Sequence, residues 1–152
     1  MAHLISVNSD CIQTFDKIKK SQIKLMVLSL DSQFKNLKIE QFSDESLPKS
    51  TQQFNNYLHQ ILPKDDARYL IFEFNYETLA GSRTKIIFLS WIPDFCPVLK
   101  KMVYATNSQS IKRGLNGIHT CIQATDYSEA NYEEILSKAS KFEREQVLKL
   151  NS

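Results

Sequence analysis

The sequence predicts an α+β domain (an α/β-like sandwich) in which a central mixed sheet of five to six strands is flanked by helices on both faces. Aromatic and β-branched runs are typical of strands, and short turns join several of these runs as hairpins. Segments with apolar residues at helical spacing lie between and beside the strands. The 152 residues contain neither an internal repeat nor a linker, so a single domain, 1–152, accounts for the chain.

The N-terminal part is expected to form one helix and one hairpin. Ser9 and Asp10 offer capping oxygens to a helix at 9–20. The core face of this helix would carry Cys11, Ile12, Phe15 and Ile18. The run "IKLMVLSL" predicts a buried strand at 23–30, and "DSQF" links it to a more exposed strand at 36–42.

A second helix and a second hairpin follow. The helix at 50–62 would end at Pro63. Its apolar face would carry Phe54, Tyr57, Leu58 and Ile61. Aromatic and β-branched strands at 67–77 and 84–91 are joined by "TLAGSR".

The C-terminal part is expected to hold a long helix, a short strand and a final helix. Asp94 is the predicted N-cap of the long helix, Pro97 falls in its first turn, and Gly117 supplies a left-handed turn after it. "HTCIQAT" predicts a strand, and a last helix at 128–148 follows. The charged tail either extends this helix or frays.

Composition argues for a soluble intracellular domain. The net charge of +2 says nothing about partners, since only its local distribution can. Three cysteines without paired spacing favour a reducing compartment and buried thiols. No secretion signal and no apolar run long enough for a membrane span is evident in the sequence.

Motifs for enzyme chemistry are missing from the sequence. It contains no glycine-rich phosphate loop and no zinc-ligand spacing. His59 is interpreted as a solvated or structural histidine rather than a ligand. The strongest candidate nucleophiles are Cys96 and Cys121, the latter on one strand face with His119, but buried cysteines are mostly inert. Solvation and the helix dipole account for the acidic pairs Asp65-Asp66 and Glu133-Glu134. We expect no catalysis, metal or cofactor.

The segment 95–125 contains no Asp or Glu and four cations, which suggests a surface for an acidic partner. Two adjoining stripes of the long helix would form that surface. One stripe consists of Lys101, Ala105, Ser108 and Lys112, and the other of Met102, Thr106, Gln109 and Arg113. Tyr104, Ile111 and Leu115 would face the core. The alternative is an ordinary amphipathic helix with a solvated basic face, although such faces usually mix charge signs. Anionic lipid headgroups are a second class of partner. Nucleic acid is less favoured, because the domain is not strongly basic and has no recognised motif.

The sequence resembles the actin-depolymerising factor/cofilin family. "WIPDFCPVLKKMVYATNSQSIKRGLNGI" is similar to that family's W-x-P-D-x-x-P-V-x-x-K-M-x-Y-A core. "IQATDYSEANYEEIL" is similar to its Q-x-T-D-x-S-E-x-x-Y-x-x-(I/V)-L stretch, and "VNSDCIQTFDKIK" and "RYLIFEFNYE" fit in order and spacing. The resemblance covers about 7–141, which implies an ADF-homology fold with a C-terminal extension at 142–152.

The resemblance implies a monomeric, cytoplasmic actin-binding protein rather than an enzyme. Such a protein binds monomeric and filamentous actin (G-actin and F-actin), prefers the ADP-bound form, and promotes filament disassembly by depolymerisation or severing. By position, the surface shared by monomer and filament binding would consist of Ser6, Val7, Lys100, Lys101, Met102, Lys112 and Arg113. The surface used only for filaments would include Arg83, Lys85, Lys138 and Lys141.

Several positions depart from the family pattern. Leu99 stands where many members carry a cation, although Lys100 could substitute. The position of the usual regulatory serine holds His3, and Ser6 is out of register, so Ser6 is expected to be a plain polar residue. The loop "TLAGSRTK" is short and Ser137 stands where a glutamate is common, which predicts weaker filament binding.

Three further expectations follow from the resemblance. The cations of the long helix could bind phosphoinositides in competition with actin. Nuclear entry is possible, but the sequence has no clear signal for it. The alternative functions are monomer sequestration, action on branched-filament machinery like that of glia maturation factor relatives, or a mainly phosphoinositide-binding role.

Overall fold

The computed structural model describes residues 4–150 and contains a six-stranded sheet with helices on both faces. In chain order the elements are α1 (Ser9–Lys19), β1 (Leu25–Leu30), β2 (Leu37–Ser43), α2 (Thr51–Ile61), β3 (Arg68–Thr78), β4 (Gly81–Trp91), α3 (Val98–Arg113), β5 (Thr120–Ala124), α4 (Tyr132–Ala139) and β6 (Val147–Leu148). Within these described residues, no helix has the length and apolarity needed to cross a membrane.

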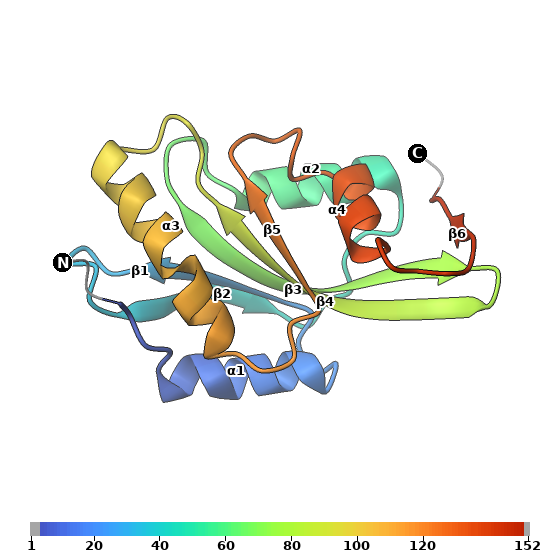
Figure 1. Cartoon of the computed structure of the whole chain (residues 1–152), viewed down its shortest axis with the longest axis horizontal. Helices are drawn as coiled ribbons and strands as arrows, with labels where there is room; N and C mark the ends of the chain where they lie inside the picture. The colour runs from blue at the N-terminus through green and yellow to red at the C-terminus, as the bar shows by residue number, and fades with distance from the viewer. Residues whose placement is uncertain (1–3, 151–152) are drawn as a thin grey trace.

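The sheet is mixed, as the sequence predicts. Its strand order is β2-β1-β3-β4-β5, with β6 paired to β3 outside this path. The β1–β2, β1–β3, β3–β4 and β3–β6 pairs are antiparallel, and β4–β5 is parallel. Strands β3 and β4 continue as a two-stranded hairpin beyond the body of the sheet (Figure 1). The hairpin carries residues of both strands away from the helices.

Two apolar clusters fill the space on the two faces of the sheet. Helices α2 and α4 cover one face, and α1 and α3 cover the other (Figure 1). Strand β3 serves both clusters, because its side chains alternate: Leu70 and Phe72 belong to the first cluster, and Tyr69 and Ile71 to the second. Burial on both faces explains why the strand is a nearly continuous apolar run.

Tyr104 attaches α3 to the sheet. Its hydroxyl accepts a hydrogen bond of 2.8 Å from the backbone N–H of Leu30, and its carbonyl accepts one of 2.7 Å from the hydroxyl of Tyr69. Tyr104, Ile111 and Leu115 are all buried, as predicted. These contacts fix which face of α3 is presented to solvent.

The predicted helix starts are wrong in two places. Asn8, not Ser9 or Asp10, caps α1 by accepting a 3.0 Å hydrogen bond from the N–H of Cys11. Asp94 does not cap α3, because the chain makes a turn in which the Cys96 N–H bonds the carbonyl of Pro93 and becomes helical only at Val98. Pro97 is the N-cap residue itself, without a side-chain cap. In α1, Ile12 is 40% exposed rather than part of the core.

The prediction of a final helix to residue 148 is also wrong. Helix α4 ends at Ala139, and Ser140 caps it with its N–H bonded to the carbonyl of Leu136. The following residues return across the sheet as β6. The "TLAGSR" connection is likewise shorter than expected, since the strands pair as far as Thr78 and Gly81. Gly81 has a φ of 127°, a conformation that favours glycine.

Candidate functional site

One of the two predicted stripes of α3 is a solvent-facing surface. Met102, Thr106, Gln109 and Arg113 are all exposed. The other stripe is interrupted, which corrects the sequence prediction. Ser108 is buried, because its hydroxyl donates a 2.9 Å hydrogen bond to the carbonyl of Tyr104 and lies 3.1 Å from the hydroxyl of Ser90. The flanking Lys101 and Lys112 are half-buried.

Three of the four cations at the two ends of α3 have no acidic partner in the described part of the chain. Lys101, Lys112 and Arg113 form no ion pair within residues 4–150. The helix dipole favours Lys112 and Arg113 in the last turn but disfavours Lys101 near the start, where the first turn contains no acid. A cation held against the local dipole without a carboxylate points to a role outside folding.

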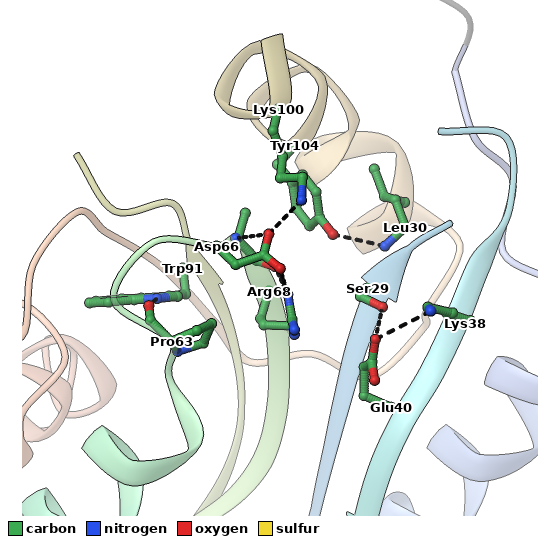
Figure 2. Close-up of polar contacts among 11 residues, drawn as sticks. Ser29, Leu30, Lys38, Glu40, Pro63, Asp66, Arg68, Trp91, Lys100 and Tyr104 are labelled. Atoms are coloured by element: carbon green, nitrogen blue, oxygen red, sulfur yellow. Dashed lines mark hydrogen bonds and ion pairs between the residues drawn. The ribbon is translucent and has the colours of Figure 1, made fainter. Parts of the chain in front are cut away.

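Lys100 behaves differently from Lys101. Its ammonium lies 2.8 Å from Oδ1 of Asp66, whose other oxygen is 2.8 Å from the guanidinium of Arg68 (Figure 2). Partial burial works to raise the pKa of Asp66, but the hydrogen bonds from Lys100 and Arg68 outweigh it and lower the pKa. Lys100 is therefore neutralised within the protein and is a poor substitute for the cation missing at Leu99.

The N-terminal segment runs along α3, so the structure brings Ser6 and Val7 to the same surface. The N–H of Ile5 donates a 2.7 Å hydrogen bond to Oδ1 of the buried Asn107, and the hydroxyl of Ser110 donates one of 3.2 Å to the carbonyl of Ile5. Val7 packs so closely on Gly114 that a Cβ there would lie 2.6 Å from the valine Cγ2. Ser6 is exposed, and His3 lies outside the described residues.

The α3 surface also has an apolar part. Leu99 and Met102 are 64% and 61% exposed. Together with Val103 and with Phe34 of the β1–β2 turn, they line a groove of about 380 Å³. Apolar side chains flanked by unpaired cations form a mixed surface suited to a protein partner with acidic and apolar groups.

The four predicted filament-side cations lie together around a second groove. Arg83 and Lys85 of β4, Lys138 of α4 and Lys141 line one concavity of about 740 Å³. Lys141 is not on α4, as was predicted, but in the turn after it. Residues far apart in the sequence thus form one basic surface, built from β4, α4 and the turn that follows α4.

Arg83 is the one cation of this group that has an acidic partner. Its Nε lies 3.2 Å from Oε2 of Glu143, which also accepts a 3.0 Å hydrogen bond from the hydroxyl of Tyr76. Lys85, Lys138 and Lys141 form no ion pair in the described part of the chain. The groove is therefore basic, with one cation neutralised.

None of the three cysteine thiols is activated as a nucleophile. Cys11 and Cys96 are buried, and Cys121 is exposed, which corrects the expectation that all three are buried. Burial raises the pKa of Cys121 and of Cys96, and it raises that of Cys11 to about 11. His119 and Cys121 line the same groove, together with Thr120 between them. These thiols are protonated at neutral pH.

Sequence reasoning was right about one of the other polar candidates and wrong about or silent on the rest. His59 is structural, as interpreted, with Nε2 3.1 Å from the carbonyl of Ala130. Asp66 was assigned to solvent but is the centre of an ion-pair network. Asn107 and Glu143 were not singled out at all. For Asn107 the available signal was an amide on the core face of a helix; for Glu143 nothing local distinguished it from its charged neighbours.

Comparison with known proteins finds the family that the sequence resembles. Residues 4–140 match the sequence model of a family described as cofilin/tropomyosin-type actin-binding protein. The cofilin of Schizosaccharomyces pombe is 33% identical over 138 residues, which covers 90% of this chain and 96% of that protein. Actin-depolymerizing factor 3 of Zea mays is 32% identical over 137 residues, which covers 89% and 94%.

A solved structure has the same fold. The crystal structure of a cofilin from Streptomyces griseoflavus has a TM-score of 0.78 and 33% identity, and the match covers 90% of this chain and 98% of that one. The relatives thus match almost end to end, and the family model spans nearly all of the described residues. The protein therefore belongs to the actin-depolymerising factor/cofilin family.

Proposed function

We propose that this protein binds monomeric and filamentous actin, prefers the ADP-bound form, and promotes filament disassembly by depolymerisation or severing. The observation that carries the proposal is the solvent-facing surface of α3, where Lys101, Lys112 and Arg113 form no ion pair within residues 4–150 and Met102 is exposed. Family membership supplies actin as the partner. The protein would act as a monomer in the cytoplasm, through one domain with its core at 7–141.

The surface shared by monomer and filament binding would combine α3 with the N-terminal segment. Ser6 and Val7 lie along α3 through the hydrogen bonds of Ile5. Lys101, Lys112 and Arg113 would contact acidic side chains of actin, and Met102 would bury apolar area at the centre of the contact. Lys100 would contribute less than its neighbours, because Asp66 already binds it.

Filament binding would add the basic groove between the β3–β4 hairpin and α4. Disassembly then needs no bond chemistry: a protein that binds one arrangement of neighbouring subunits more tightly shifts the filament toward that arrangement. The expected weakness of filament binding also gains a different cause. The hairpin projects despite its short turn (Figure 1), so the neutralisation of Arg83 by Glu143, rather than loop length, would reduce the affinity.

Phosphoinositide binding is a second candidate function. The unpaired Lys101, Lys112 and Arg113 would attract the phosphates of anionic headgroups as readily as carboxylates. Because the cations are shared, headgroup and actin would compete. Vesicles containing phosphatidylinositol bisphosphate should then displace actin monomers from the protein, and vesicles of neutral lipid should not.

The primary test is co-sedimentation with ADP-actin filaments, combined with a fluorescence assay of monomer binding. The variant Lys112→Ala, Arg113→Ala removes two cations from α3 and should weaken both affinities by about tenfold or more. The matched control Lys49→Ala, Lys64→Ala removes two exposed, unpaired cations outside the proposed surface and should change neither affinity. Equal losses in both double variants, or no loss in the first, would refute the proposed surface. Monomer binding by the wild type without filament loss would instead indicate a sequestering protein.

A further inference from the structure

The C-terminal segment 141–150 is fastened along the projecting hairpin. Strand β6 pairs antiparallel with the end of β3, placing Val147 opposite Thr78 and Leu148 opposite Glu77 (Figure 1). The N–H of Leu79, at the hairpin turn, adds a 3.0 Å hydrogen bond to the carbonyl of Gln146. The segment thus reaches the tip of the hairpin that carries the filament-side residues of β4.

Apolar contacts fix the position of this segment. Val147 and Leu150 pack against the cluster that contains Phe74, Tyr76 and Tyr132. This packing explains why the chain leaves α4 and pairs as a strand instead of continuing as a charged helix. The side chains between α4 and β6 are held over the basic groove as a consequence.

Glu143 occupies a built position in that groove. Its side chain is only 11% exposed, with Oε2 3.2 Å from Nε of Arg83 and 3.0 Å from the hydroxyl of Tyr76. Burial works to raise the pKa of Glu143, but the Tyr76 hydrogen bond and the charge of Arg83 prevail and lower it. The carboxylate is therefore ionised at neutral pH and bound to the cation that an acidic partner would need.

The two carboxylates of this segment, Glu143 and Glu145, differ in whether they form an ion pair. Glu145 also lines the groove but forms no ion pair within residues 4–150. Lys85 and Lys138 remain unpaired on the same rim. Glu143 thus acts on one specific cation, whereas Glu145 contributes only to the general charge of the groove.

We propose that the part of this segment from Glu143 to Leu150 is a built-in competitor for the filament-side surface, with the Glu143 carboxylate standing in for an acidic side chain of the filament. This inference rests on the proposed function and specifies how its second surface is regulated. Filament binding through Arg83 would exchange one carboxylate for another, while monomer binding through α3 would be unaffected. The Arg83 side chain of the pair is 33% exposed, so an acidic group of the filament can reach it, and the segment would lower filament affinity several-fold without abolishing it.

The test compares Glu143→Gln with the matched control Glu145→Gln in the otherwise unchanged protein. Both variants remove one negative charge from the groove, but only the first breaks the pair with Arg83. We expect Glu143→Gln to raise filament affinity in co-sedimentation by about threefold, Glu145→Gln to raise it less, and monomer affinity to stay unchanged. In an Arg83→Gln background, Glu143→Gln should have no larger effect than Glu145→Gln, because the cation that it releases is gone.

Opposite results would overturn the inference. If Glu143→Gln unfolds at the wild-type temperature but binds filaments more weakly, the segment supports the filament-binding surface rather than competing for it. Equal gains in Glu143→Gln and Glu145→Gln would reduce the effect to general charge. If no form of the protein binds filaments, the filament part of the proposed function is refuted, but the competitor model can still be tested. A decaglutamate peptide is then titrated against the wild type and Glu143→Gln, and NMR chemical shifts of Arg83 are followed. The competitor model is contradicted if the peptide shifts Arg83 no more in Glu143→Gln than in the wild type.

Discussion

Replacing Asn107 by alanine should destabilise the protein. Asn107 is 1% exposed, and its Oδ1 accepts the 2.7 Å hydrogen bond from Ile5, itself 2% exposed. The substitution leaves the buried Ile5 N–H without this acceptor, which costs about 1–3 kcal/mol. The Nδ2 bond of 2.9 Å to the carbonyl of Val103 is a smaller loss, because that carbonyl also accepts a bond within the helix. We therefore expect about 2 kcal/mol in the free energy of unfolding, or roughly 4–8 °C in Tm.

Urea denaturation followed by circular dichroism measures the stability change, and Ser110→Ala is the matched control. The Ser110 hydroxyl bonds the carbonyl of the same Ile5 at 3.2 Å in a half-buried position, so its loss should cost less than about 1 kcal/mol. Hydrogen exchange should show faster exchange of the Ile5 amide in Asn107→Ala, with the middle of α3 still protected. A change below about 0.5 kcal/mol, or a larger cost for Ser110→Ala, would refute the role assigned to this buried amide.

Three further outcomes are expected. Asp66→Asn should lower the free energy of unfolding by about 1 kcal/mol, because Lys100 loses its ion pair, and thermal denaturation would detect the change. Burial, aided by the charge of Lys85, lowers the pKa of His119 below its ordinary 6.5, and its Nδ1 accepts a 2.8 Å hydrogen bond from the N–H of Ile86. The unfolded chain therefore binds the proton first, so the urea midpoint should fall as the pH drops below about 6.5. The variant His119→Gln should lose this part of the pH dependence. Ellman's reagent should label the exposed Cys121 in the native protein and the other thiols only after unfolding, and early labelling of a second thiol would contradict the burial assigned here.

The strands and the helix faces could be predicted from the sequence because their signals are local. The alternation in β3 follows from side chains that enter two different cores, and the 3.6-residue period of α3 places Met102 and Arg113 on one exposed stripe. The same reasoning placed Ser108 on a contact stripe, since a serine can be either exposed or buried with hydrogen bonds. Its partner, Ser90, lies in strand β4, and helical periodicity cannot predict a contact with a strand.

The end of α4 could not be predicted for a similar reason. The residues after Ala139 have the alternating charges of a solvated helix, and local propensity favours continuing it. Strand pairing at Val147 and the packing of Leu150 on the apolar cluster outweigh that preference, because they bury apolar area that a solvated helix would expose. Such competition is decided by a surface that only the folded sheet creates.

The two basic surfaces differ in a way that neither charge counts nor spacing reveals. Asp66, which precedes β3, neutralises Lys100 of α3. The neighbouring Lys101 forms no ion pair within residues 4–150, although the helix dipole disfavours a cation near the start of α3. That surface is ready to bind without rearrangement. The groove beside the hairpin holds one of its cations, Arg83, in an ion pair with Glu143. Because the preformed surface and the self-occupied one lie on different elements, changes in the C-terminal segment should alter filament binding while leaving monomer binding intact. A change that moved both affinities together would mean that the two surfaces are coupled.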